Sequence, residues 1–176
     1  RRISADDSNE AARLLKIIGD FERIADHAVN LVHSSEELQQ KKMELSAPAL
    51  AELKVLTSAV SEILSLSLDA FLKDDLQSAV MVEPLEQVID GLKEQLRTNH
   101  ILRLQKEQCS IEAGFVWSDM LTDLERVSDH CSNIAGCIMD MHEGKLNLHE
   151  SLRAMKEDRE KFAERYALYQ EKYKLA

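Results

Sequence analysis

A short segment that occurs twice constrains the fold of this 176-residue chain more than any other feature. The segment 20–27 (DFERIADH) recurs as 123–130 (DLERVSDH), and Asn30 and Asn133 extend the identity by one helical turn. Shared helical periodicity explains matching apolar positions, but it does not explain matching polar ones. The chain therefore carries a duplicated helical unit whose polar residues retain a role.

Composition and apolar spacing both predict an all-α fold. Glycine occurs five times, proline twice, and aromatic residues make up 5% of the chain, which favours long helices over a sheet. Apolar residues recur at i, i+3, i+4 and i+7 in five stretches, and no stretch alternates with period two for long enough to form a strand. We predict an antiparallel bundle of about five long helices with short connections.

Capping residues set the expected boundaries. Ser46 is the expected N-cap of the second helix, Asp74 or Asp75 that of the third, and Asn147 that of the fifth, while Gly144 should end the fourth. The helices are expected at about 6–37, 47–73, 76–104, 111–142 and 148–176.

Three further expectations concern the course of the helices and their packing. Pro84 should kink or restart the third helix, because its ring removes one backbone hydrogen bond. Since the apolar line continues beyond it, we expect one helix with a bend. The polar run 39–42 should connect the first two helices. The apolar stripe of the first helix is expected to face the core and comprises Leu14, Ile17, Ile18, Phe21, Ile24, Ala25, Ala28, Val29 and Val32.

Charge and cysteine content exclude several classes of function. With a net charge of −10, the chain lacks the clustered Lys and Arg that nucleic-acid binding requires. No run approaches 18 apolar residues, so we expect no direct membrane insertion of this segment. Three cysteines without C-x-x-C spacing predict reduced thiols in a cytosolic protein.

Three of the expected helices carry a Glu-x-x-x-Asp pair, which projects both acids from one face at the edge of the core. The pairs are Glu22/Asp26, Glu86/Asp90 and Glu125/Asp129. Antiparallel third and fourth helices could gather four carboxylates, which suit cations such as Fe, Mn, Mg or Ca. Solvated surface acids, with Arg126 and Lys93 as counter-ions, are the open alternative.

Several repeated residues are candidates to support such a site. His27 and His130 are either hydrogen-bonding packing residues, which we favour, or ligands, and Asn30 and Asn133 could orient the acids. Arg23 joins Arg126 as a repeated cation next to the acids. The sequence contains no Glu-x-x-His, no Ser-His-Asp arrangement and no Gly-rich phosphate loop. We therefore predict no catalytic residues, and a metal-dependent enzyme is the least favoured alternative.

The polar pattern resembles a known family. The second copy of the repeat, followed by Asn133-Ile134-Ala135, resembles the signature of PhoU-like domains, and segment 21–27 is its counterpart. The stretch 100–104, followed by Cys109, resembles the PhoU-like tail of bacterial sodium/phosphate cotransporters in particular. The similarity covers about residues 6–142.

The resemblance implies an internal repeat of three-helix units with the signature on the third helix of each. Residues 1–45 would hold the last helix of a truncated first repeat, 46–144 a complete second repeat and 145–176 a C-terminal helix. Since the chain begins at Arg1, the other helices of the first repeat would lie upstream.

The resemblance also implies a metal site. In the family such acid pairs bind iron or other divalent or trivalent metals, often as clusters. By position, one site would contain Glu86, Asp90, Glu125 and Asp129, and half of another would contain Glu22 and Asp26. The family usually has Gly before the signature Asp, where this chain has Ala25 and Ser128. This departure leaves the geometry of the metal site open.

For function, the resemblance implies a non-catalytic regulatory domain of a bacterial sodium/phosphate cotransporter, on the cytoplasmic side of the membrane. Its partner would be the membrane region of the same parent chain. The alternative is a free-standing PhoU-type regulator that signals to a phosphate transporter and a kinase. The upstream helices that the chain lacks would leave an apolar groove beside the first helix, and this predicts a possible homodimer.

Overall fold

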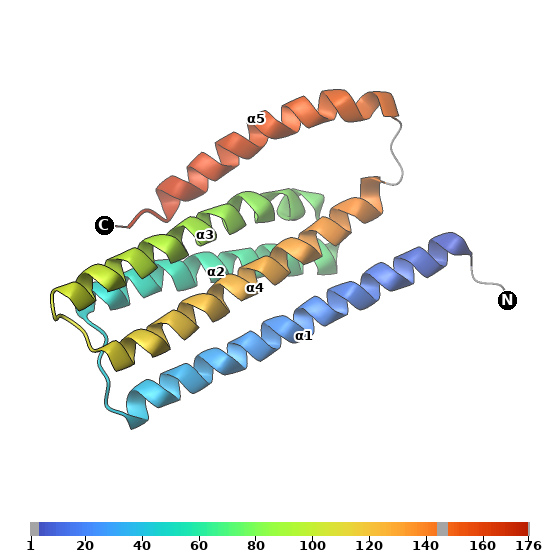
Figure 1. Cartoon of the computed structure of the whole chain (residues 1–176). Coiled ribbons are helices and arrows are strands. Elements are labelled where there is room, and N and C mark those ends of the chain that lie inside the picture. The colour runs from blue at the N-terminus through green and yellow to red at the C-terminus, as the bar shows by residue number, and fades with distance from the viewer. Residues whose placement is uncertain (1–3, 144–147, 176) are drawn as a thin grey trace.

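The computed structural model describes residues 4–143 and 148–175, and the side chains of all of these except 5, 6, 143 and 148–159. Five α-helices form an elongated bundle, and no strand occurs within these ranges (Figure 1). The helices are α1 (Ala5–Gln40), α2 (Ala47–Lys73), α3 (Leu76–Gln105), α4 (Ile111–Glu143) and α5 (Leu148–Lys172). The predicted all-α bundle is confirmed.

Local capping chemistry fixes most boundaries as expected. The Ser46 side chain accepts the backbone N–H of Ala49 at the start of α2, and Asp75 caps α3. Asp74 instead ends α2 in the left-handed conformation, with φ of 54°. The first helix continues through Gln40, so part of the expected connection 39–42 is helical, because Gln and Glu favour helix and the backbone turns left-handed only at residue 42. The expected roles of residues 144 and 147 lie outside the described residues.

Pro84 neither breaks nor restarts α3, which continues as one helix through residue 105. A proline at this position leaves the carbonyl of Val80, four residues earlier, without its usual helical donor. The guanidinium of Arg165, on α5, donates to that carbonyl at 3.5 Å. A residue far along the chain therefore compensates for the missing hydrogen bond.

The core is centred on α4, which packs against α1, α2 and α3, while α5 packs on α3. Its largest fully buried side chains include Trp117 and Ile134 of α4, Leu56 and Ile63 of α2, and Leu85 of α3. By length and composition alone α2 could cross a membrane, since an 18-residue window has a mean hydropathy of 1.5. In this structure α2 contributes to the core beside α3 and α4.

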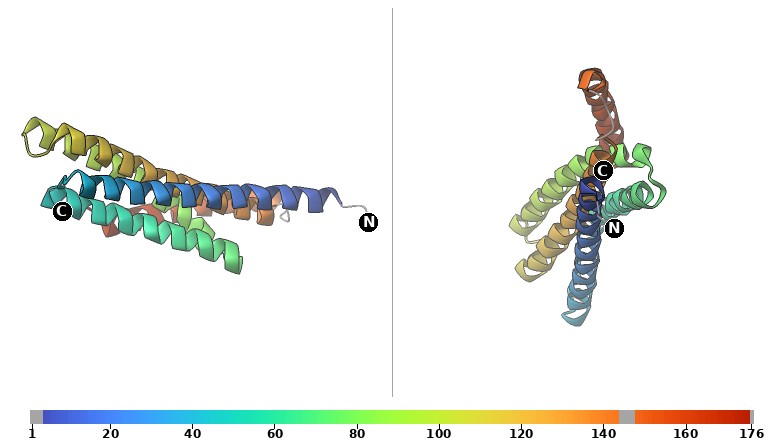
Figure 2. Two further views of the ribbon diagram at one scale, coloured as in Figure 1. Left: turned by 90° about the horizontal axis from the view of Figure 1, so that it is seen from below. Right: turned by 90° about the vertical axis from the view of Figure 1, so that its right-hand side faces the viewer.

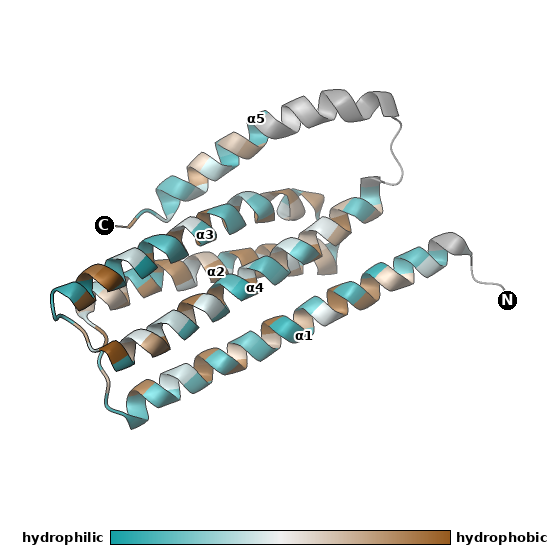
Figure 3. Cartoon of the chain, in the orientation of Figure 1, coloured by the Kyte–Doolittle hydropathy of each residue, from teal (hydrophilic) through white to brown (hydrophobic). Residues whose placement is uncertain are grey.

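The helix α1 lies at the edge of the bundle and packs along α4 (Figures 1 and 2). Only part of its apolar stripe faces the core. Ile17 and Ile24 are buried, but Ile18, Val29 and Val32 are each more than half exposed. The expectation that the whole stripe is core is therefore wrong, because among the described helices only α4 runs along α1. Apolar and hydrophilic positions are interspersed along the coloured part of α1 (Figure 3).

Candidate metal site and the repeat interface

Two acid pairs meet where α3 and α4 run antiparallel. Carboxylate oxygens of Glu86, Asp90 and Asp129 all lie within 4.8 Å of one another. Glu86 and Asp129 are half-buried, and Asp90 is exposed. Because the two helices run in opposite directions, each Glu-x-x-x-Asp pair presents its acids to the other. The structure thus brings together three of the four acids predicted for one site.

The fourth acid, Glu125, lies beside this group but has a cation of its own. Its Oε1 is 3.0 Å from the ammonium of Lys93, and both side chains are only 16% exposed. On the outer side, the guanidinium of Arg126 lies 3.2 Å from Asp129 and is half exposed. The counter-ions expected from the sequence are therefore present.

The three clustered acids are nevertheless short of positive charge. Burial, followed by the nearby Asp90 carboxylate, raises the pKa of Glu86 to about 7. Burial, followed by repulsion from Glu125, also raises the pKa values of Asp90 and Asp129. A cation held between these oxygens would relieve this repulsion. The donor set consists of carboxylates alone, which suits hard or borderline metal ions.

The first copy of the motif is arranged differently. Glu22, Arg23 and Asp26 are all exposed on α1. Within the part of the chain that the structure describes, no further acid joins Glu22 and Asp26 as a possible ligand group. One motif therefore has its partner helix, and the other projects into solvent.

The repeated histidines and asparagines join the two copies to each other. His27 Nδ1 lies 2.7 Å from Asp123 Oδ1, and Asn30 donates to the same oxygen at 3.2 Å. This places the repeated His in the packing role that the sequence favoured.

The same arrangement recurs with the two helices exchanged. His130 Nδ1 lies 2.9 Å from Asp20 Oδ1, which also accepts from Asn133 at 3.4 Å. The asparagines were expected to orient the acids on their own helix, but each bonds an aspartate of the opposite one. The α1–α4 interface is therefore reciprocal, like a twofold contact between subunits.

Sequence reasoning missed Asp20 and Asp123 as the centres of this interface. They are only 6% and 9% exposed, and the rings of His27 and His130 stack between them with centroids 5.7 Å apart. The signal was available, because an identical Asp opens both copies of the repeat.

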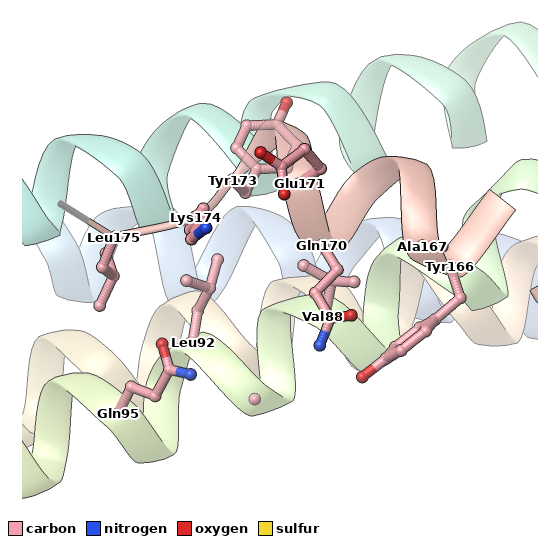
Figure 4. Close-up of a pocket in the computed structure, with 11 residues that line it drawn as sticks. Val88, Leu92, Gln95, Tyr166, Ala167, Gln170, Glu171, Tyr173, Lys174 and Leu175 are labelled. Carbon is pink, nitrogen blue, oxygen red and sulfur yellow. The ribbon is translucent and has the colours of Figure 1, made fainter. Parts of the chain in front are cut away.

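A separate hollow of about 510 Å³ lies between α3 and α5 (Figure 4). Val88, Leu92 and Gln95 line it from α3, and Gln170 and Lys174 line it from the C-terminal part of the chain. It contains none of the predicted site residues, so it is distinct from the acidic cluster.

Comparison with known proteins identifies the region that contains the cluster. Residues 53–138, which extend from α2 to α4, match the family model described as the PhoU domain. The "Phosphate-specific transport system accessory protein PhoU homolog 1" of Thermotoga maritima is 28% identical over 142 residues, which cover 81% of this chain and 60% of the relative.

Two further relatives have similar names. The "Phosphate-specific transport system accessory protein PhoU homolog" of Zymomonas mobilis is 29% identical over 80% of this chain and 58% of its own length. The protein of the same name in Pseudomonas aeruginosa is 25% identical over 90% and 64%, respectively. The chain thus spans about 60% of the length of the curated relatives it matches. No solved structure matches it significantly. The region that matches the PhoU domain model, residues 53–138, holds both acid pairs of the cluster.

Proposed function

We propose that this chain is a PhoU-type regulator of phosphate transport, acting by protein contacts on the cytoplasmic side of a bacterial membrane and without catalysis. The observation that carries the proposal is the PhoU domain in the α2–α4 bundle. The relatives that match across it are named accessory proteins of phosphate-specific transport systems.

These names favour one of the two interpretations that the sequence left open. The relatives are named as accessory proteins, and none of these names is that of a sodium/phosphate cotransporter. We therefore prefer a regulator that contacts a phosphate transporter, and signals to a kinase, over a domain covalently joined to a cotransporter.

Affinity purification from the source bacterium tests this choice. A tagged chain, cross-linked in cells grown in low phosphate, should recover components of a phosphate-specific transport system. Its deletion should change the uptake of labelled phosphate. Recovery of a sodium/phosphate cotransporter in place of that system would support the other interpretation, and unchanged uptake would contradict a regulatory role.

We further propose that Glu86, Asp90 and Asp129 bind a divalent or trivalent metal ion, with iron or manganese as the first candidates. The proximity of three carboxylates from two helices supports this, together with their unbalanced charge. Glu125 would stay with Lys93 or join the metal ion.

The chain supplies its own control for the metal site. Elemental analysis and anomalous scattering, on protein prepared with Fe or Mn, should find metal at the α3–α4 cluster. Glu86→Gln with Asp90→Asn should abolish it. Glu22→Gln with Asp26→Asn changes the same motif where no third acid is nearby, and should leave it in place. The site is wrong if stoichiometric metal never appears or survives the first pair of substitutions.

A further inference from the structure

We propose that Lys93 is a built-in cation that limits the acidic cluster between α3 and α4 to a single metal ion. The role assigned to Lys93 rests on the metal site proposed above and concerns how many ions that site holds. The observation behind it is the ion pair between the Lys93 ammonium and Glu125 Oε1, which lie 3.0 Å apart. Both side chains are largely buried, and such a pair is screened much less than one at the surface.

The four acids at this contact divide into a group of three and a paired acid. Oxygens of Glu86, Asp90 and Asp129 lie within 4.8 Å of one another, and Glu125 is not a member of this group. Yet Glu125 precedes Asp129 by one turn of α4, so both project from the same side of the helix. Lys93 accounts for the division, because its ammonium contacts the Glu125 carboxylate.

Glu125 is held by cations of the chain at both of its oxygens. The second cation is Arg126, whose Nε lies 3.9 Å from Glu125 Oε2. Since Arg126 is 55% exposed, solvent screens its charge more than that of Lys93. Burial and the charge of Glu125 raise the pKa of Asp90, and the charge of Lys93 opposes them. The ammonium therefore acts on the paired acid and on a ligand of the proposed site.

Charge balance explains why one ion suffices. The carboxylates of Glu86, Asp90, Glu125 and Asp129 together carry four negative charges, and the ammonium of Lys93 cancels one of them. One trivalent ion balances the remainder, and one divalent ion leaves a single negative charge. A second ion of either kind would make the group net positive. Sites that hold two metal ions keep them about 3.5–4 Å apart, and the ammonium beside Glu125 already supplies a second positive centre.

Metal stoichiometry of the full chain tests the role of Lys93. It is measured by equilibrium dialysis against Mn²⁺ with elemental analysis, and circular dichroism confirms that each variant is folded. The wild-type chain should hold about one ion and give the EPR spectrum of isolated Mn²⁺. Lys93→Met keeps an unbranched side chain but removes its charge, so this variant should hold about two ions and give an exchange-coupled spectrum. Lys93→Arg keeps the charge and should hold one ion.

Two further variants serve as controls. Lys93→Met combined with Glu125→Gln removes both members of the ion pair, so no unpaired buried charge remains and the site should hold one ion again. Lys73→Met removes another lysine that is paired with an acid, since Lys73 Nζ lies 2.8 Å from Asp69 Oδ1 on α2. It should leave the stoichiometry at one ion.

The outcomes separate the role of Lys93 from the metal site itself. If neither the wild-type chain nor any variant binds Mn²⁺ or iron, the proposed metal site is wrong and the role of Lys93 is wrong with it. Two ions in the wild-type chain, or one ion in a folded Lys93→Met chain, would overturn only the role of Lys93. Lys93→Gln, which keeps a neutral donor for Glu125, replaces the Met variant if that variant does not fold, and the same counts decide.

Discussion

Replacement of Glu86 by Gln should make the metal-free protein more stable at high pH. The folded chain holds the Glu86 proton up to a pKa of about 7, whereas the ordinary value is 4.5. The unfolded chain therefore loses this proton first as pH rises, and folding stability falls between about pH 4.5 and 7. A direct conversion of the pKa difference gives about 3 kcal/mol. Because Glu86 is only half-buried, solvent screening reduces our expectation to about 1 kcal/mol.

Urea denaturation followed by circular dichroism, with a chelator present, measures this effect. At pH 8 the Glu86→Gln variant should exceed the wild type by about 1 kcal/mol in free energy of unfolding, and the gap should close towards pH 5. Glu22→Gln, in the exposed copy of the motif, serves as the control and should show no gap. Added Mn²⁺ should stabilise the wild type and the Glu22→Gln variant, but not the Glu86→Gln variant. If the variant and the wild type have the same free energy of unfolding at pH 8, or differ equally at pH 5 and pH 8, the charge-repulsion argument is refuted.

Four other substitutions probe the packing, each measured by the same urea assay. Ser128→Ala should raise stability by about 1 kcal/mol, because the fully buried hydroxyl finds no hydrogen-bond partner among the described residues. Gly114→Ala should cost about 1–3 kcal/mol, since the added Cβ would lie 2.5 Å from the His100 ring, whereas Gly136→Ala, with open space around it, should gain about 0.5–1 kcal/mol. Asp123→Ala should cost about 1–3 kcal/mol, because it removes the shared acceptor of an imidazole and an amide of α1. No loss in the Asp123 variant, a gain at Gly114 or a loss at Gly136 would contradict these contacts.

The helices could be predicted where the information is local. Ser46 and Asp75 cap the helices that follow them through bonds to residues two or three positions away, so the sequence contains both partners. Pro84 is the contrasting case. The carbonyl that it frees is reached by Arg165, a residue of another helix. Periodicity carries no information on such a donor.

The buried side of α1 could not be predicted from its stripe alone. Ile17 and Ile18 are adjacent and equally apolar, yet one is buried and the other is 57% exposed. An apolar pattern shows how much of a helix surface could be buried. The number of helices packed against it decides how much of that surface is buried. For α1 that neighbour is α4, so the rest of the stripe is exposed in the described structure.

The two copies of the repeat explain why one part of the site was harder to predict than the other. Asp20 and Asp123 perform the same task in both copies, because each copy is the partner of the other and the contact is reciprocal. Whether an acid pair can form part of a metal site depends instead on a third helix packed beside it. Glu125 and Asp129 have α3 beside them, while Glu22 and Asp26 face solvent. Identical residues thus keep an identical role only where their surroundings are duplicated as well, and an acid motif becomes a candidate metal site through its neighbours.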